Sequence, residues 1–366
     1  MEQTNATIAT PLAERHRQSG ARMGTWFGCD LPSDFGDWPS EYRNARRTVA
    51  LLDTNYHSFF SFTGPDRVRY VNAILTGNIK DLKLNHADLS LLLNPQGRIL
   101  AEIETLALQD SLLCISFASV RERLAEVLEK FIIMDDVTLT DETPRFGSLM
   151  LYGPNSSTVI LQMSANFDPG TLDLSGSLEV VLGGLDCRII QKKMGTLSVF
   201  ELITAKENLL SLWDILSNAA KANGGGPIGY TAWNSLSLEE NIPWFGNDFG
   251  EKQIPHEAGL QDSHISYTKG CYTGQEIVER VRSRGQVNRQ RVLLRFSGEP
   301  LPAAGTPLTV GGKEAGLVTR SAEVPDSSGG IGMGYLRKEN NSPASILDYP
   351  GGTATVIAPA TAAASD

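Results

Sequence analysis

The sequence contains no stretch that approaches the ~18 consecutive apolar residues needed to span a bilayer. Its first twenty residues also lack the apolar core of a secretory signal. We therefore expect a cytoplasmic protein without a membrane partner.

Cysteine is scarce. The four cysteines lie far apart, with no CxxC pair and no histidine at metal-ligand spacing. This pattern indicates neither a zinc site nor a disulfide framework, so we expect reduced thiols and no bound metal. The cysteines are Cys29, Cys114, Cys187 and Cys271.

Positive charge is in deficit, with 32 lysines and arginines against 42 aspartates and glutamates, a formal net charge of −10. Repulsion between this excess negative charge and the phosphates opposes nonspecific electrostatic binding to nucleic acid, so no nucleic-acid partner is expected. A local basic run does lie between residues 269 and 295. It indicates either a solvated helix face followed by an ordinary strand, or a site for an anionic ligand. Its arginines include Arg280, Arg282, Arg289 and Arg291.

The 366 residues, 41% of them hydrophobic, predict a globular protein with more than one domain. Up to residue 284, helical and strand patterns alternate, which predicts an α+β fold. Helices are expected over 40–53, 65–75, 154–163 and 208–223, and over 119–133 behind a capping box of Ser119 and Glu122. Hairpins are expected at the turns 94–97 and 183–184. After Gly285, short strands separated by glycine and proline predict a small β-barrel or sandwich.

The segment KGCYTGQE at 269–276 is the most informative stretch. Thr273 and Glu276 match a capping box, which would place Cys271 just ahead of a helix N-terminus. The helix dipole and Lys269 would then favour a thiolate, and Gly274 would let a ligand approach the backbone. The alternative is an inert, buried cysteine between ordinary turn residues.

KGCYTGQE resembles the signature of the YgfZ branch of the GcvT-like folate-binding family. A second segment upstream, NIPWFGNDFGEKQIPHEAGL, and a third, FTGPDRVRYVNAILTGNI, are also similar to family patterns. The strands GLVTRS and GIGMGYLR resemble those of the family's C-terminal domain. The resemblance thus extends over nearly the whole chain.

This resemblance implies a three-domain ring around a central folate cavity, with a folate-binding region at 8–284 and a C-terminal β-barrel domain at 286–359. It implies tetrahydrofolate, or a one-carbon derivative, as the ligand. Cys271 and Lys269 would be the catalytic residues. The cofactor-binding residues would be Glu201, Glu102, Tyr272, Gly274, Gln275, Arg280 and Arg282.

Glu201 lies in GTLSVFEL, similar to a family strand, although an earlier glutamate of that pattern is absent here. A carboxylate there could accept the paired donors of a pterin edge, or Glu201 could be an exposed strand residue. Arg280 and Arg282 would attract the folate glutamate tail. Trp244 and Phe245 would stack on the pterin or, as is more common beside a proline, anchor the core.

Two departures separate the chain from the aminomethyltransferases of the family. The paired aspartates that follow their NPQGRIL-like turn are replaced by Ala101 and Glu102, and Cys271 stands where those enzymes usually lack a cysteine. The favoured hypothesis is therefore a tetrahydrofolate-binding factor of iron–sulfur cluster assembly or repair, with iron–sulfur proteins or their assembly machinery as partners. A tetrahydrofolate-dependent aminomethyltransferase and a passive folate sensor are the alternatives.

Overall fold

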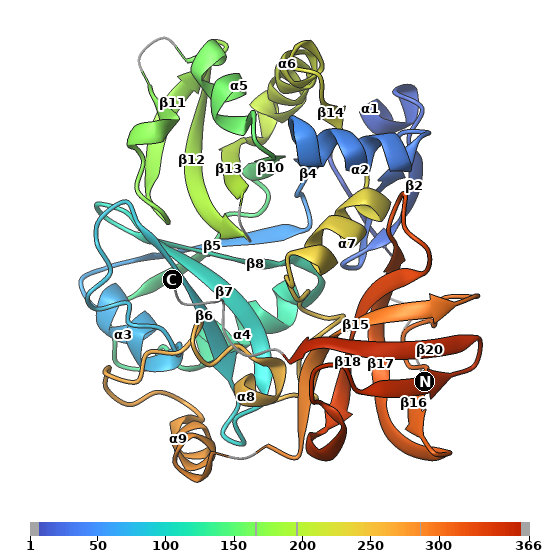
Figure 1. Ribbon diagram of the computed structural model, residues 1–366. Helices are drawn as coiled ribbons and strands as arrows, with labels where there is room; N and C mark the ends of the chain where they lie inside the picture. Colours follow the sequence, from blue (N-terminus) through green and yellow to red (C-terminus); the bar gives the residue numbers. More distant parts are fainter. Residues whose placement is uncertain (1–6, 165–166, 195–196, 286, 360–366) are drawn as a thin grey trace. The chain divides into compact units, whose positions relative to one another are not determined.

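The computed structural model describes residues 7–164, 167–194, 197–285 and 287–359 (Figure 1). Contacts divide the chain into two compact units. The first combines the residues up to Tyr70 with Ile79–Asp88 and Ile103–Trp233. The second combines Val71–Asn78, Leu89–Glu102 and the chain from Asn234 onward. The expected domain division between residues 284 and 286 stays a prediction, and residue 286 lies outside the described residues.

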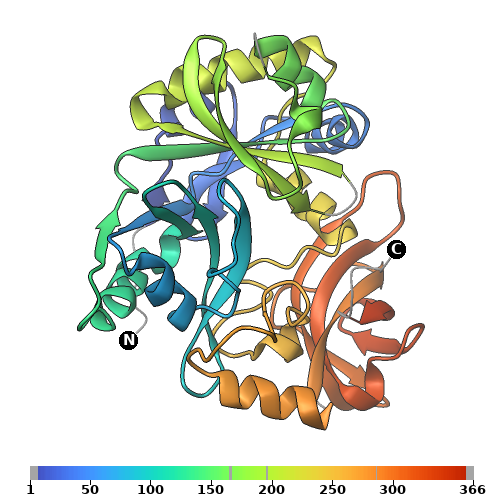
Figure 2. The same ribbon diagram turned by 90° about the vertical axis from the view of Figure 1, so that its left-hand side faces the viewer.

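A six-stranded sheet with the order β11-β12-β13-β10-β4-β14 forms the centre of the first unit. Helices α5 (Ser156–Met163) and α6 (Leu209–Ala222) lie on one face of this sheet (Figure 2). Apolar residues of α6 recur at three- and four-residue spacing and are buried in the core, which is why this segment is a helix. The strands are Ser177–Leu182 (β11), Leu185–Met194 (β12), Leu197–Ala205 (β13), Phe146–Tyr152 (β10), Ala50–Asp53 (β4) and Gly226–Pro227 (β14).

Two glycines form the turn between β11 and β12. Gly183 and Gly184 have φ angles of 56° and 86°, and a two-residue hairpin loop of this kind needs positive φ at both positions. The predicted hairpin is confirmed.

The N-terminal segment forms a three-stranded sheet with the order β1-β3-β2, followed by helix α2 (Trp38–Arg47). The prediction of one helix over 40–53 is wrong in its second half. Asp37 caps α2 by accepting a hydrogen bond from the Ser40 amide, and the helix ends at Arg47. All four residues of β4 are buried, because the strand lies inside the sheet between β10 and β14. The other elements are Ile8–Ala9 (β1), Ala13–Gln18 (α1), Arg22–Trp26 (β2) and Cys29–Asp34 (β3).

A five-stranded sheet has the order β6-β7-β8-β5-β9. The turn between β6 and β7 is confirmed, with the Gly97 amide donating to the Asn94 carbonyl. The capping box of Ser119 and Glu122 is wrong, because a 3-10 turn at Ala118–Val120 leads into α4, whose N-terminus has no side-chain cap. The elements are His57–Thr63 (β5), Arg67–Ile74 (α3), Ala87–Leu93 (β6), Ile99–Ala107 (β7), Leu112–Phe117 (β8), Arg121–Lys130 (α4) and Thr138–Asp141 (β9).

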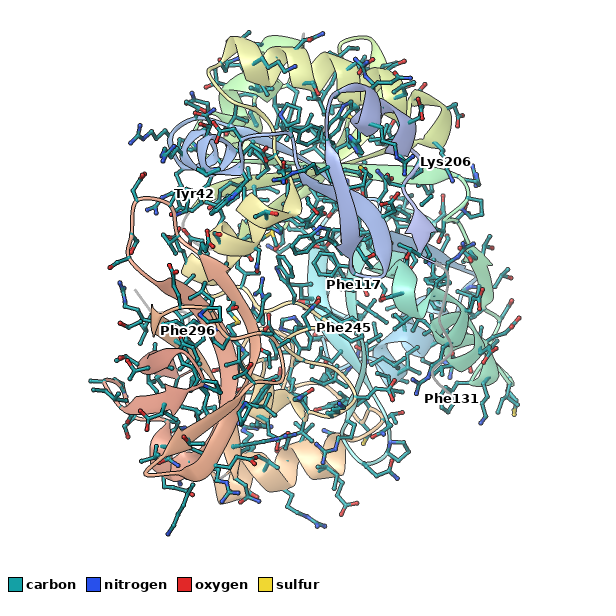
Figure 3. The ribbon with its side chains drawn as sticks, turned by 90° about the vertical axis from the view of Figure 1, so that its right-hand side faces the viewer. Tyr42, Phe117, Phe131, Lys206, Phe245 and Phe296 are labelled. Carbon is teal, nitrogen blue, oxygen red and sulfur yellow. The ribbon has the colours of Figure 1, made fainter. Side chains whose placement is uncertain are left out.

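The second unit contains a closed six-stranded barrel with the order β15-β18-β17-β16-β19-β20. Its interior is apolar and includes Phe296 (labelled in Figure 3). The predicted C-terminal barrel is confirmed. Its strands are Arg289–Gly298 (β15), Pro307–Val310 (β16), Lys313–Glu323 (β17), Gly330–Arg337 (β18), Ile346–Tyr349 (β19) and Gly352–Pro359 (β20). The helices that precede it are Tyr230–Glu239 (α7), Pro255–Ala258 (α8) and Gln275–Arg284 (α9).

Candidate functional site

Cys271 differs from the other cysteines in its exposure. Cys29, Cys114 and Cys187 are buried, and burial raises the pKa of each thiol to about 12. Cys271 is exposed to solvent in the loop before α9. It is therefore the cysteine that a reagent or partner can reach.

The helix after Cys271 begins differently from the sequence prediction. Gly274, not Thr273, is the N-cap of α9, and no side chain caps this end, so the capping box of Thr273 and Glu276 is wrong. The physical reason is the backbone at Gly274, which has a left-handed φ of 82°. The expected reactivity of Cys271 stays a prediction.

The Cys271 loop is packed tightly against the turn between β6 and β7. A Cβ atom at Gly97 would meet the Ile277 side chain at 2.9 Å. A Cβ atom at Gly274 would lie 3.3 Å from the Gly97 Cα atom. Both positions need glycine for this approach, so Gly274, the second glycine of KGCYTGQE, has a structural reason that requires no ligand.

Lys269 holds the loop to the end of helix α3. Its ammonium donates to the carbonyl oxygens of Asn72, Leu75 and Gly77 at 2.5–2.6 Å. An ammonium has three protons, so these bonds use all of its donors. The structure thus gives Lys269 an anchoring role, and its catalytic role stays a prediction.

Glu102 accepts a hydrogen bond from a histidine that the sequence analysis did not single out. His264 Nε2 lies 2.9 Å from Glu102 Oε1, and His264 Nδ1 lies 2.7 Å from Ser263 Oγ. The His264 side chain is 6% exposed and that of Glu102 is 19% exposed. Nothing in one sequence could pair residues so far apart, although Ser263 and His264 are adjacent in the chain.

The remaining predicted residues of the segment lie around α9, beside α8 (Figure 2). Tyr272 is buried, and its hydroxyl has no hydrogen-bond partner among the described residues. Gln275 is half-buried at the first position of the helix. Arg280 is paired with Glu276, whereas the Arg282 guanidinium lies 4.1 Å from the centre of the Tyr267 ring. Their roles in folate binding stay predictions.

Glu201 lies in the first unit within a group of buried charges. Its carboxylate is ion-paired with Lys192 and lies 2.7 Å from His57 Nδ1. Lys192 also donates to Glu104 at 2.5 Å. The Glu201 side chain is only 1% exposed, so the alternative of a solvent-facing strand residue is wrong. We refer to Glu201, Lys192, Glu104 and His57 as the buried charge cluster.

Charges within this cluster shift one another's ionisation. Burial alone would raise the pKa of Glu201, but the charges of Lys192 and His57 hold it well below its usual range. The two carboxylates likewise hold the pKa of Lys192 above its usual range, against the effect of burial. Burial raises the pKa of Glu104. Of the two carboxylates in the cluster, Glu201 is therefore the one that is firmly ionised and can only accept hydrogen bonds.

An aromatic group adjoins the buried charge cluster. The rings of Tyr56 and His57 lie 4.4 Å apart, and Tyr56 stacks on Phe27 at 4.3 Å and on Phe117 at 5.5 Å. Phe117, at the end of β8, is labelled in Figure 3. Phe27 and Phe117 are half-buried, so the group offers flat apolar faces beside an ionised carboxylate.

The sequence analysis missed this group and three of the four cluster residues. The available signal was a charged side chain, such as Glu104, inside a largely apolar strand.

Trp244 and Phe245 are both buried. The Arg320 guanidinium lies 3.9 Å from the centre of the Trp244 ring, and the Phe245 ring contacts Phe249 edge to face. These contacts give both aromatic residues the role of core anchors.

The described part of the chain contains no group of three or more histidine, cysteine, aspartate or glutamate side chains that could hold a metal ion. None of the helices in the described residues is long and apolar enough to cross a membrane.

Known proteins resemble this chain over most of its length. An aminomethyltransferase of Rubrobacter xylanophilus is 26% identical over 338 residues, covering 92% of this chain and 89% of the relative. An aminomethyltransferase of Herpetosiphon aurantiacus is 27% identical and covers 89% of this chain and 88% of its own.

Among solved structures, the glycine cleavage system aminomethyltransferase T of Bartonella henselae superposes with a TM-score of 0.87 at 21% identity, covering 96% of this chain and 97% of the other. The chain therefore shares that fold, which confirms the predicted fold class. The model of the GCVT N-terminal domain matches residues 12–264, more than half of the sequence. The chain belongs to the GCVT N-terminal domain family.

Proposed function

We propose that this protein binds tetrahydrofolate or a one-carbon derivative and acts as a folate-dependent transferase of the aminomethyltransferase type. Its relatives named aminomethyltransferase match it over about nine-tenths of its length, which favours this reading over the iron–sulfur hypothesis. The YgfZ-like features of the sequence then describe a branch within a transferase-related family.

The observation that carries the proposal is the ionised carboxylate of Glu201 beside an aromatic group. A pterin presents its 2-amino and ring N–H groups as a paired donor edge, which one carboxylate can accept in bidentate fashion. Lys192 and His57 keep Glu201 charged despite its burial. Tyr56 and its aromatic neighbours supply a face for the flat ring. The carboxylate and the rings are the kinds of groups that a pterin edge and face need, and a bound pterin would share the Glu201 carboxylate with Lys192 and His57.

Binding is tested by titrating tetrahydrofolate into the protein by calorimetry under anaerobic conditions. Glu201→Gln should weaken binding at least tenfold, because an amide offers one acceptor and loses the charge. Glu179→Gln, on the exposed face of β11, is the matched control and should leave the affinity unchanged. Equal affinity of wild type and Glu201→Gln would refute the assignment of Glu201.

Transfer is tested by mixing the protein with an aminomethyl-loaded lipoyl carrier and tetrahydrofolate. We expect methylene-tetrahydrofolate to form faster in the presence of the protein than in the uncatalysed reaction. Tight folate binding without turnover would support the assignment of folate as the ligand and would refute the transferase activity. Glu102 stands at one of the two positions where the aminomethyltransferases of the family have paired aspartates, so Glu102→Gln should lower turnover if it has inherited the catalytic role.

The exposure of Cys271 favours a second candidate, a folate-binding factor of iron–sulfur cluster assembly or repair. Three cysteines are buried as ordinary core residues, and Cys271 is displayed. Cys271→Ser should keep the fold and the folate affinity but abolish support of iron–sulfur enzymes in cells that lack the protein. Thr268→Ala, an exposed change in the same loop, is the control. Full support by Cys271→Ser would eliminate this candidate.

A further inference from the structure

Three side chains of the second unit form a continuous hydrogen-bonded array. Ser263 Oγ lies 2.7 Å from His264 Nδ1, and His264 Nε2 lies 2.9 Å from Glu102 Oε1. A hydroxyl, an imidazole and a carboxylate are thus connected in that order. This is the order of groups that activates a serine nucleophile.

The array fixes which nitrogen of His264 carries a proton. An ionised carboxylate can only accept a hydrogen bond, so the nitrogen facing Glu102 must be the donor. In the neutral imidazole, Nδ1 is then left with its lone pair, and this lone pair faces the Ser263 hydroxyl. The hydroxyl therefore donates to a base, as a serine must before it attacks a carbonyl carbon.

The imidazole is held in place by its surroundings. The Thr76 hydroxyl donates to the His264 carbonyl at 2.6 Å, and the His264 amide donates to the Leu260 carbonyl at 3.0 Å. The next turn is fastened by the Ser266 amide, which donates to the Thr76 carbonyl at 3.0 Å. The base is buried, whereas Ser263 is exposed, so a molecule from solvent can reach the nucleophile but not displace its base.

We propose that Ser263 is an activated nucleophile toward small carboxylic esters, with His264 as its general base and Glu102 as the residue that positions the imidazole. Ser263 Oγ forms a bond to the ester carbonyl carbon while its proton passes to His264 Nδ1. The alcohol leaves as its bond to that carbon breaks, and it takes the proton from His264. Water then attacks the acyl-serine by the same route and releases the acid, which restores Ser263.

The test is covalent labelling with a fluorophosphonate probe, which needs no folate, so its failure leaves the folate proposal intact. Wild-type protein is incubated with the probe, and the adduct is located by peptide mass mapping. The expected result is an adduct on Ser263, formed at least tenfold faster than on Ser266 of the same loop. Labelling of Ser263 at the rate of other exposed serines would overturn the proposal.

Variants separate activation from mere exposure. Ser263→Ala should remove the adduct, and His264→Gln should slow it at least tenfold, while Ser266→Ala should change nothing. Glu102→Gln should slow labelling and Glu102→Asp should restore part of the rate. Nitrogen-15 NMR of the wild type should show His264 protonated at Nε2, and a proton at Nδ1 instead would contradict the mechanism without any variant.

Discussion

Gly274 lies so close to Asn94 that a Cβ atom added at Gly274 would stand 2.7 Å from the Asn94 carbonyl oxygen. The neighbouring atom is backbone, so it cannot turn aside as a flexible side chain would. Gly274 also has a left-handed φ of 82°. On the side of the Cys271 loop, the contact with the turn between β6 and β7 thus requires glycine at position 274.

Gly274→Ala should therefore destabilise the protein and displace the Cys271 loop. The left-handed backbone alone costs an alanine roughly 1–2 kcal/mol, and the contact with Asn94 adds to that cost. Denaturant unfolding measures the loss, and the rate of Cys271 modification by a thiol reagent measures the displacement. Gly270→Ala is the matched control, because a Cβ atom at Gly270 meets nothing within 4 Å. Equal losses for the two changes would contradict this account.

Lys269→Met should destabilise the second unit, because three carbonyl oxygens would lose their charged donor. A buried acceptor left without a partner costs about 1–3 kcal/mol. The free energy of unfolding should fall by at least that amount, measured with urea. Lys313→Met, at an exposed position of the barrel, should have almost no effect. An unchanged stability of Lys269→Met would show that the anchor is not needed.

Local patterns in the sequence predicted much of the fold. The hairpin glycines Gly183 and Gly184, the apolar stripe of α6 and the short strands of the barrel all predict their elements because each depends on neighbours in the chain. The predicted helix over 40–53 extends too far along the chain. The short apolar run of β4 could equally be the buried end of a helix, and hydrophobic periodicity does not distinguish the two. Burial between two other strands decided the outcome.

The candidate sites were harder to predict, because their residues meet only through tertiary structure. Glu201 and Lys192 are brought together by the register of β12 and β13, in which Glu201 pairs with Ile190 and Lys192 pairs with Val199. His264 and Glu102 are 162 residues apart. Family resemblance pointed to Glu201 and Glu102, but no local pattern identifies the side chains that hold them.

Asp53 predicts a pH dependence of stability. Burial would raise its pKa, but the hydrogen bond and charge of His16 and the Thr10 hydroxyl hold the pKa below its usual value. A carboxyl group with a lowered pKa in the folded state stabilises the fold above its unfolded pKa of about 3.9. This contribution is lost as the pH falls through the lower, folded value.

The free energy of unfolding of Asp53→Asn should therefore lie about 3–5 kcal/mol below that of wild type at pH 7, since one partner of a buried pair is lost. The difference should shrink as the pH is lowered below 4, because wild type then loses the same interaction. Asp186→Asn, an exposed change, serves as the control. A gap between Asp53→Asn and wild type that stays constant with pH would exclude Asp53 as the titrating group.

Arg320→Lys should destabilise the second unit although it keeps the charge. The Arg320 guanidinium reaches the Asp248 carboxylate at 2.8 Å and the Ile242 carbonyl at 2.8 Å, and it stacks on the Trp244 ring. A lysine has no planar fork, so it cannot stack and bond in several directions at once. Loss of a hydrogen bond to a charged group costs about 1.5–3 kcal/mol, and unfolding should reveal at least this loss.

Arg295→Lys provides the comparison for this substitution, because Arg295 is an exposed residue of the same barrel. Its free energy of unfolding should stay within about 0.5 kcal/mol of wild type, as is usual for surface substitutions. Tryptophan emission should shift only in Arg320→Lys, since Trp244 loses its stacked partner there. If both changes lowered stability equally, the effect would belong to any arginine of the barrel rather than to the fork that joins Asp248 to Trp244.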